Sequence, residues 1–233
     1  MRSVIGVLTF TIFVFSFARG EVFEKYHRNI DSGEKYITVA FVLDGFPNKD
    51  ANLHSNVGVW LKDSYDKAAK ILSEKLKVEI KFEVTDILPA PGALTEEIKY
   101  RTVGGQMHGP TILDAVKKTY EKHINPDIIC VVTKGKFYDG RLSNEVGFAK
   151  VTTLCEDMVP ILLTFTSELV DDVSKTATLL SKLVKDSVDN HKWDKTDPRK
   201  DYFNGCNVRH KLKGDSDEEY YVLPIDKGIF YDF

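Results

Sequence analysis

Apolar residues recur along the chain with two different periods, which predict alternating strands and helices. Val78, Ile80, Phe82 and Val84 alternate with charged residues, as in a strand with one buried face. Alternation and continuous apolar runs predict strands at 36–43, 78–84, 127–133, 146–151 and 159–165. Apolar positions repeated at steps of three and four predict helices at 52–76, 111–123 and 169–189.

The order of these elements predicts an α/β fold with a twisted mixed sheet and three main helices. Strands that alternate with helices form a mostly parallel sheet on which the helices pack. We expect the short strand at 146–151 to run antiparallel at an edge. Residues 88–110 are rich in proline and glycine, and we expect a surface excursion there, with a short helix near 94–101.

The chain begins with a pattern typical of a cleaved secretory signal. Arg2 precedes an apolar run from Val4 to Phe17, and small residues follow at Ala18 and Gly20. The run is shorter than the roughly 20 residues that span a bilayer, although a signal anchor is the competing interpretation. We therefore predict a signal peptide at 1–20 and a secreted, extracellular protein, with no later segment apolar enough to cross a membrane.

The remaining residues predict one domain with a small appendage. Residues 21–233 suit a single domain, with a main subdomain at about 36–189. Residues 190–233 are irregular and polar, so we expect a small C-terminal subdomain there. The stretch from His191 to Asp201 has mixed charge and predicts a solvated loop.

The charge balance of the chain limits the kinds of binding partner that we expect. The chain has 32 basic and 35 acidic side chains, and loss of Arg2 and Arg19 with the leader leaves 30 against 35. A mildly acidic protein lacks the basic face that nucleic acid requires. We expect no nucleic-acid partner, and we expect a monomer.

Three cysteines suggest one disulfide in an oxidising compartment. Cys130 lies within an apolar run that predicts a buried strand, where a free thiol behaves as a small hydrophobic group. Cys155 and Cys206 lie in loop-like contexts. We therefore predict a disulfide between Cys155 and Cys206 and a free thiol at Cys130.

Several segments together resemble one family. The element order, the segment Gly147–Val151 followed by Cys155, and the turn Tyr221-Val222-Leu223-Pro224 are similar to the catalytic domain of reprolysin-type, adamalysin-like metzincins. These are zinc metalloproteases found in venoms and in tick saliva. The resemblance covers about residues 36–225 and implies a metzincin-like fold.

The zinc motif of that family, H-E-x-x-H-x-x-G-x-x-H, is degenerate in this chain. Its positions fall on the third predicted helix and hold Ser181, Lys182, Lys185, Val188 and His191, while Leu223 takes the place of the methionine in the following turn. One imidazole is too few, because a catalytic zinc ion needs three protein ligands. The resemblance therefore implies no zinc, no other cofactor and no catalytic residue, that is, a pseudoenzyme and not an enzyme.

Taken together, these features predict a secreted protein that acts by binding another extracellular protein or peptide. A cleft beside an edge strand is suited to pairing with an extended peptide. Two alternatives stay open. The first is an active secreted zinc metalloendopeptidase whose ligands lie elsewhere in the sequence, and the second is a secreted binding or carrier protein unrelated to proteases.

Overall fold

The structure is a computed structural model that describes residues 23–27, 32–206, 208–212 and 223–226. The predicted signal peptide at 1–20 lies outside the described residues. Within the described part of the chain, no helix combines the length and the apolar character needed to cross a membrane.

A five-stranded sheet forms the centre of the molecule, in the order β3-β2-β7-β10-β9. Its strands are β2 (Lys35–Leu43), β3 (Ile80–Pro89), β7 (Ile128–Thr133), β9 (Gly147–Phe148) and β10 (Val159–Thr164). The first four strands in this order are parallel, and β9 pairs with β10 in the antiparallel sense at the edge. The predicted α/β class, with a mostly parallel sheet and an antiparallel edge strand, is confirmed.

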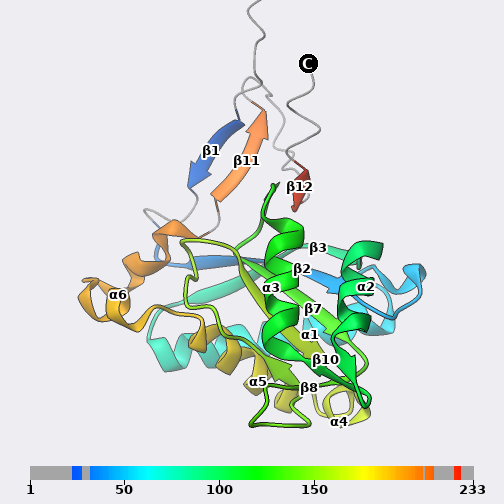
Figure 1. Cartoon of the computed structure of the whole chain (residues 1–233). Helices are drawn as coiled ribbons and strands as arrows, with labels where there is room; N and C mark the ends of the chain where they lie inside the picture. The colour runs from blue at the N-terminus through cyan, green and yellow to red at the C-terminus, as the bar shows by residue number, and fades with distance from the viewer. Residues whose placement is uncertain (1–22, 28–31, 207, 213–222, 227–233) are drawn as a thin grey trace, which may run out of the picture.

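Helices cover both faces of this sheet (Figure 1). The helices of the two layers are α1 (Asn56–Leu76), α2 (Gly92–Tyr100), α3 (Gly109–Tyr120), α4 (Ser167–Val170) and α5 (Val173–Asp186). α1 and α5 pack side by side in the apolar core on one face. α2 and α3 share a second apolar core on the other face. The sheet is buried on both sides, which explains why β7 and β10 are continuous apolar runs.

The predicted helix at 169–189 is interrupted. The chain forms the short α4, breaks at Asp171 and Asp172, and restarts as α5, whose first turn is capped by the Asp172 side chain. The carboxylate of Asp172 accepts a hydrogen bond from the backbone N–H of Lys175 at 3.0 Å, which satisfies one of the free donors at a helix start.

Smaller elements complete the described fold. The excursion after β3 holds α2 and the strands β4 (Thr102–Val103) and β5 (Gln106–His108), which form a three-stranded sheet with β8 (Lys136–Tyr138). A short 3-10 helix, η1 (Asn48–Asp50), precedes α1.

The C-terminal part is more regular than predicted. It contains α6 (Asn190–Lys195), the 3-10 helix η2 (Arg199–Gly205), β11 (Val208–Leu212) and β12 (Ile225–Asp226). β11 pairs with β1 (Phe23–His27), and β12 pairs with β6 (His123–Ile124). The β1–β11 pair lies apart from the central sheet (Figure 1).

Candidate functional site

The five positions of the degenerate motif lie on α5 and on the segment that follows it. Ser181 is fully buried in α5, and its hydroxyl has no hydrogen-bond partner. Lys182 is exposed and forms an ion pair with Asp186 one turn later, with 2.6 Å between Nζ and Oδ2. Lys185 is exposed in the last turn of the helix. Ser181 therefore faces the core, while both lysines face solvent.

The remaining positions lie beyond the end of α5. Ser187 caps the helix, and Val188 is buried in the core. His191 belongs to the separate helix α6, where its side chain is exposed and its backbone N–H donates to Asp189 Oδ1 at 2.9 Å. The structure thus distributes the motif positions between the core and the surface and does not bring all five together.

Leu223, in the place of the family's methionine, is buried. Its carbonyl oxygen accepts a weak hydrogen bond from the Thr85 hydroxyl at 3.4 Å. Tyr221 and Val222, the first two residues of the predicted turn, lie outside the described residues.

Metal-ligating side chains do not cluster in the described residues, where no group of three or more His, Cys, Asp or Glu side chains could hold a metal ion. The absence of zinc stays a prediction.

The cysteines are arranged as predicted. Cys155 Sγ and Cys206 Sγ form a disulfide across a sequence separation of 51 residues, which confirms the predicted pair. Cys130 is an unpaired thiol in the middle of β7, and complete burial strongly raises its pKa. A thiol held in its neutral form is a poor nucleophile, so Cys130 acts as a core residue.

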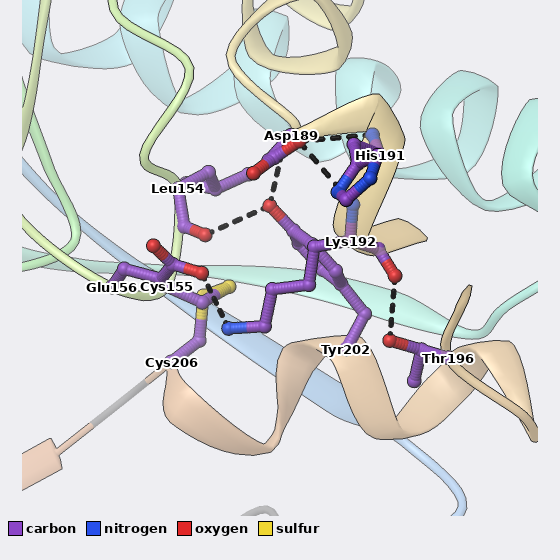
Figure 2. A network of polar contacts seen from close by, with 9 residues as sticks. All are labelled: Leu154, Cys155, Glu156, Asp189, His191, Lys192, Thr196, Tyr202 and Cys206. Carbon is purple, nitrogen blue, oxygen red and sulfur yellow. Dashed lines mark hydrogen bonds and ion pairs between the residues drawn. A yellow bond between two sulfur atoms is a disulfide. The ribbon is translucent and has the colours of Figure 1, made fainter. Parts of the chain in front are cut away.

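Tyr202 connects the segment after α5 to the turn at Leu154 (Figure 2). Its hydroxyl accepts a hydrogen bond from the backbone N–H of Asp189 and donates one to the carbonyl oxygen of Leu154, both at 3.0 Å. Burial raises the pKa of Tyr202, the hydrogen bond from the Asp189 N–H opposes this shift, and the nearby carboxylates of Glu156 and Asp189 add to it. The phenol therefore stays neutral and can donate throughout the physiological range.

Two further interactions close the same network. Asp189 caps α6 by accepting hydrogen bonds from the N–H groups of His191 and Lys192. The Lys192 ammonium pairs with Glu156, which follows the disulfide cysteine Cys155 (Figure 2). These contacts hold the segment that carries His191 in place through hydrogen bonds and one ion pair.

The expectation of a solvated loop between His191 and Asp201 is wrong. Residues 190–195 form α6, and Trp193 is buried against the rings of Tyr202 and Phe203, at centroid distances of 5.6 and 5.9 Å. Packing of these aromatic rings holds the segment against the domain, while the charged side chains of α6 stay exposed. The Tyr202-Phe203 pair, which the sequence-based interpretation left without a role, is the signal in the sequence that marks this cluster.

The outer edge of β9 is the second candidate site. Gly147 and Phe148 pair with Leu163 and Leu162 of β10, and β9 is the last strand of the sheet. A Cβ atom on Gly147 would lie 2.9 Å from a methyl of Leu183 on α5, so the absent side chain lets strand and helix approach closely. The edge strand therefore lies directly against the helix that carries the motif positions.

Comparison with known proteins finds little similarity in sequence. No protein-family model matches this chain. No curated protein is a significant match to it. Among solved structures, the chain is similar to archaemetzincin from Methanopyrus kandleri, with a TM-score of 0.39 and 15% sequence identity. The match covers 65% of this chain and 73% of that chain.

This neighbour is an archaemetzincin and not a reprolysin, so the narrower resemblance to reprolysin-type domains is not supported. The prediction that the chain is a pseudoenzyme and not an enzyme is wrong as an inference from the motif positions. That prediction treated Ser181, Lys182 and Lys185 as replaced ligands of one site. Ser181 is buried and both lysines are exposed, so the three side chains do not face a common point. The residue types at these positions therefore do not show whether the chain is an enzyme.

Proposed function

We propose that the chain is a secreted protein that binds an extended peptide segment of another extracellular protein along the outer edge of β9. The observation that carries this proposal is the outer edge of β9 and the backbone that follows it, which take no further strand partner among the described residues. A sheet edge of this kind adds an extended peptide as a further strand, with main-chain hydrogen bonds for affinity.

The unpaired stretch begins directly after a paired residue. Glu145 exchanges two backbone hydrogen bonds with Phe137, at 2.8 and 2.9 Å, so β8 covers the edge at this point. Residues 149–152 continue without helix or strand assignment, and their backbone groups bond to no other backbone group outside the strands among the described residues. The part of the edge without a further strand partner among the described residues therefore begins at Gly147.

The direction of the backbone groups follows from the alternation of an antiparallel pair. The carbonyl oxygen of Val146 accepts from the N–H of Thr164, so Val146 and Phe148 direct their polar groups toward β10. Glu145 directs its groups outward, toward Phe137. The same alternation directs the backbone groups of Gly147 and Ala149 outward, where a bound strand would meet them.

The side chains beside this edge suit a peptide with apolar contacts. Ala149 and Val151 are half-buried and pack against the main core, while Lys150 and Thr152 are exposed. In the resemblance to reprolysin-type domains, the same edge strand borders the cleft that takes an extended peptide. The signal-like leader and the Cys155–Cys206 disulfide support an extracellular location, since disulfides persist in oxidising compartments.

A matched pair of substitutions tests the proposal. Peptides selected from a displayed random library against the full chain are titrated against wild type, Ala149→Pro and Ala149→Val by calorimetry. Proline removes the outward N–H, whereas valine retains it and suits an extended strand. We expect Ala149→Pro to weaken binding about tenfold, the equivalent of one lost hydrogen bond, and Ala149→Val to bind within about twofold of wild type.

The same experiment separates the alternatives. Unchanged affinity in a correctly folded Ala149→Pro protein, checked by thermal unfolding, places the peptide elsewhere and refutes the proposal. Peptides recovered in cut form, with cleavage abolished by a chelator, indicate a zinc metalloendopeptidase. A library that yields no binding peptide favours a carrier of another kind of ligand.

A further inference from the structure

An open cleft lies beyond the carboxyl ends of β2, β7 and β10, on the chain segments that leave these three strands. We call it the switch-point cleft and define it by Phe46, Lys49, Asp50, His54, Lys134 and Phe165, which are among its lining residues. Its volume is about 490 Å³. This is within the range of about 300–1,000 Å³ that is typical of small-molecule sites.

The topology of the sheet explains why a cleft opens at this place. The chain leaves β2 toward α1, which covers one face of the sheet, and leaves β7 toward Phe137, which belongs to the core on the opposite face. The connections of two adjacent parallel strands therefore diverge to opposite faces. Open α/β sheets bind ligands at such a point, outside the carboxyl ends of the strands.

The wall of the cleft is aromatic and fixed in position. The Phe165 ring makes edge-to-face contacts with Phe46 at 5.5 Å and with Trp60 at 5.0 Å between centroids. Trp60 is buried, and its indole N–H donates to the carbonyl oxygen of Leu169 at 3.2 Å. A planar apolar group can stack here without having to order the wall first.

The rim of the cleft has an excess of positive charge. Lys49 and Lys134 are exposed, and neither forms an ion pair with a carboxylate among the described residues. Lys134 Nζ lies 4.7 Å from the centroid of the Phe46 ring, so this cation is held over the aromatic wall. Asp50 is the carboxylate among the lining residues, in a chain whose net charge is −3. The cleft is thus locally positive on an acidic protein.

We propose that the switch-point cleft binds a small organic anion with a planar apolar body, such as an aromatic phosphate ester or carboxylate. The planar body lies on Phe46 and Phe165, and the anionic group lies between the ammonium groups of Lys49 and Lys134. This site is independent of the peptide edge at β9, because its lining residues come from other segments of the chain.

Calorimetric titration of the full chain with phenyl phosphate tests this inference. Benzyl alcohol supplies the ring without the charge, and inorganic phosphate supplies the charge without the ring. We expect phenyl phosphate to bind at least tenfold more tightly than either comparison compound, and Lys134→Ala to weaken it about tenfold, as expected for one charge-assisted contact. Lys70→Ala, an exposed lysine near the other end of α1, is the matched control and stays within twofold of wild type.

Three results overturn the inference: no saturable heat with phenyl phosphate, equal affinity for either comparison compound, or equal affinity of the Lys134→Ala variant. Lys134 is exposed, so its replacement leaves the fold intact, which thermal unfolding verifies. The Ala149→Pro variant should keep its affinity for phenyl phosphate. The peptide titration and the phenyl phosphate titration can therefore refute the two proposals independently of each other.

Discussion

The phenolic hydroxyl of Tyr202 donates a hydrogen bond to the carbonyl oxygen of Leu154 at 3.0 Å, across 48 residues of sequence. The Tyr202 hydroxyl oxygen also accepts a hydrogen bond from the N–H of Asp189, so this one hydroxyl joins three segments. The disulfide between Cys155 and Cys206 joins two of these segments beside it. One covalent bond and one buried hydroxyl are therefore among the links between the C-terminal part of the chain and the main domain.

Tyr202→Phe should lower the free energy of unfolding by about 1–3 kcal/mol. The substitution keeps the ring, but it leaves the Leu154 carbonyl and the Asp189 N–H without their partner in a buried site. Urea unfolding measures the change. Tyr100→Phe, at a side chain that is 86% exposed, serves as the control, and equal stability of the two variants would contradict this role for Tyr202.

Ser181→Ala should raise the free energy of unfolding by about 1 kcal/mol. The Ser181 hydroxyl is fully buried without a partner, so its removal abolishes a desolvation cost at little loss of packing. Ser187→Ala is the matched comparison on the same segment, because the buried Ser187 hydroxyl donates to the Leu183 carbonyl at 2.9 Å. We expect opposite signs for the two substitutions in parallel urea titrations, and a loss of stability for both would refute the assignment of Ser181.

Much of the central fold could be predicted because apolar periodicity reflects burial on the two faces of the sheet. The continuous apolar runs of β7 and β10 and the alternation at 78–84, which overlaps the first half of β3, each marked a strand, and the short segment at 146–151 contains the antiparallel edge strand β9. The parallel direction of the strands was predicted from the alternation of strands and helices along the chain. Each of these features depends on many residues at once, so its prediction does not depend on any single residue.

The helix ends and the C-terminal part could not be predicted in the same way. Leu169, Val170 and Val173 continue the apolar pattern across the break between α4 and α5, so only the cap formed by Asp172 marks the start of α5. α6 is short and strongly charged, and its formation depends on packing of Trp193 against Tyr202, a contact between residues nine apart. Tertiary contacts of this kind leave no periodic signal.

Helical spacing in the sequence also failed to predict which motif positions lie together at the candidate site. A spacing of four places Ser181 and Lys185 on one side of an ideal helix, yet Ser181 is buried and Lys185 is exposed. Lys185 lies in the last turn, where Leu183 and Val184 take the buried positions and the chain then turns inward at Val188. Helical spacing in the sequence was therefore insufficient to define a common site.

Asp44→Asn should stabilise the protein at pH 7 and have less effect at pH 3. Burial raises the pKa of Asp44, although its hydrogen bond from Thr95 opposes the shift. A carboxyl group whose pKa is higher in the folded state binds more protons there, so its contribution to stability is lost as pH rises above about 4. Asparagine retains an acceptor for Thr95 and carries no charge.

Urea unfolding of both proteins between pH 3 and pH 7 checks this sign. The advantage of the Asn variant should grow as pH rises, because the charged carboxylate of wild type is then partly desolvated. A difference that stays constant with pH, or that grows toward acid, contradicts the shift at Asp44.

Gly58→Ala should destabilise the protein by about 2 kcal/mol or more, although alanine is normally the better residue inside a helix by about 1 kcal/mol. A Cβ atom on Gly58 would lie 2.1 Å from the backbone oxygen of Asn52 and 2.8 Å from backbone atoms of Leu53. Backbone atoms cannot move aside as a flexible side chain can, so the clash outweighs the gain in helix propensity.

Gly92→Ala, in the first turn of α2 with nothing within 4 Å of its Cβ position, should be neutral or stabilising. Thermal unfolding of the two variants gives this comparison directly, and a Gly58→Ala protein as stable as wild type would show that the segment before α1 can shift away from the helix.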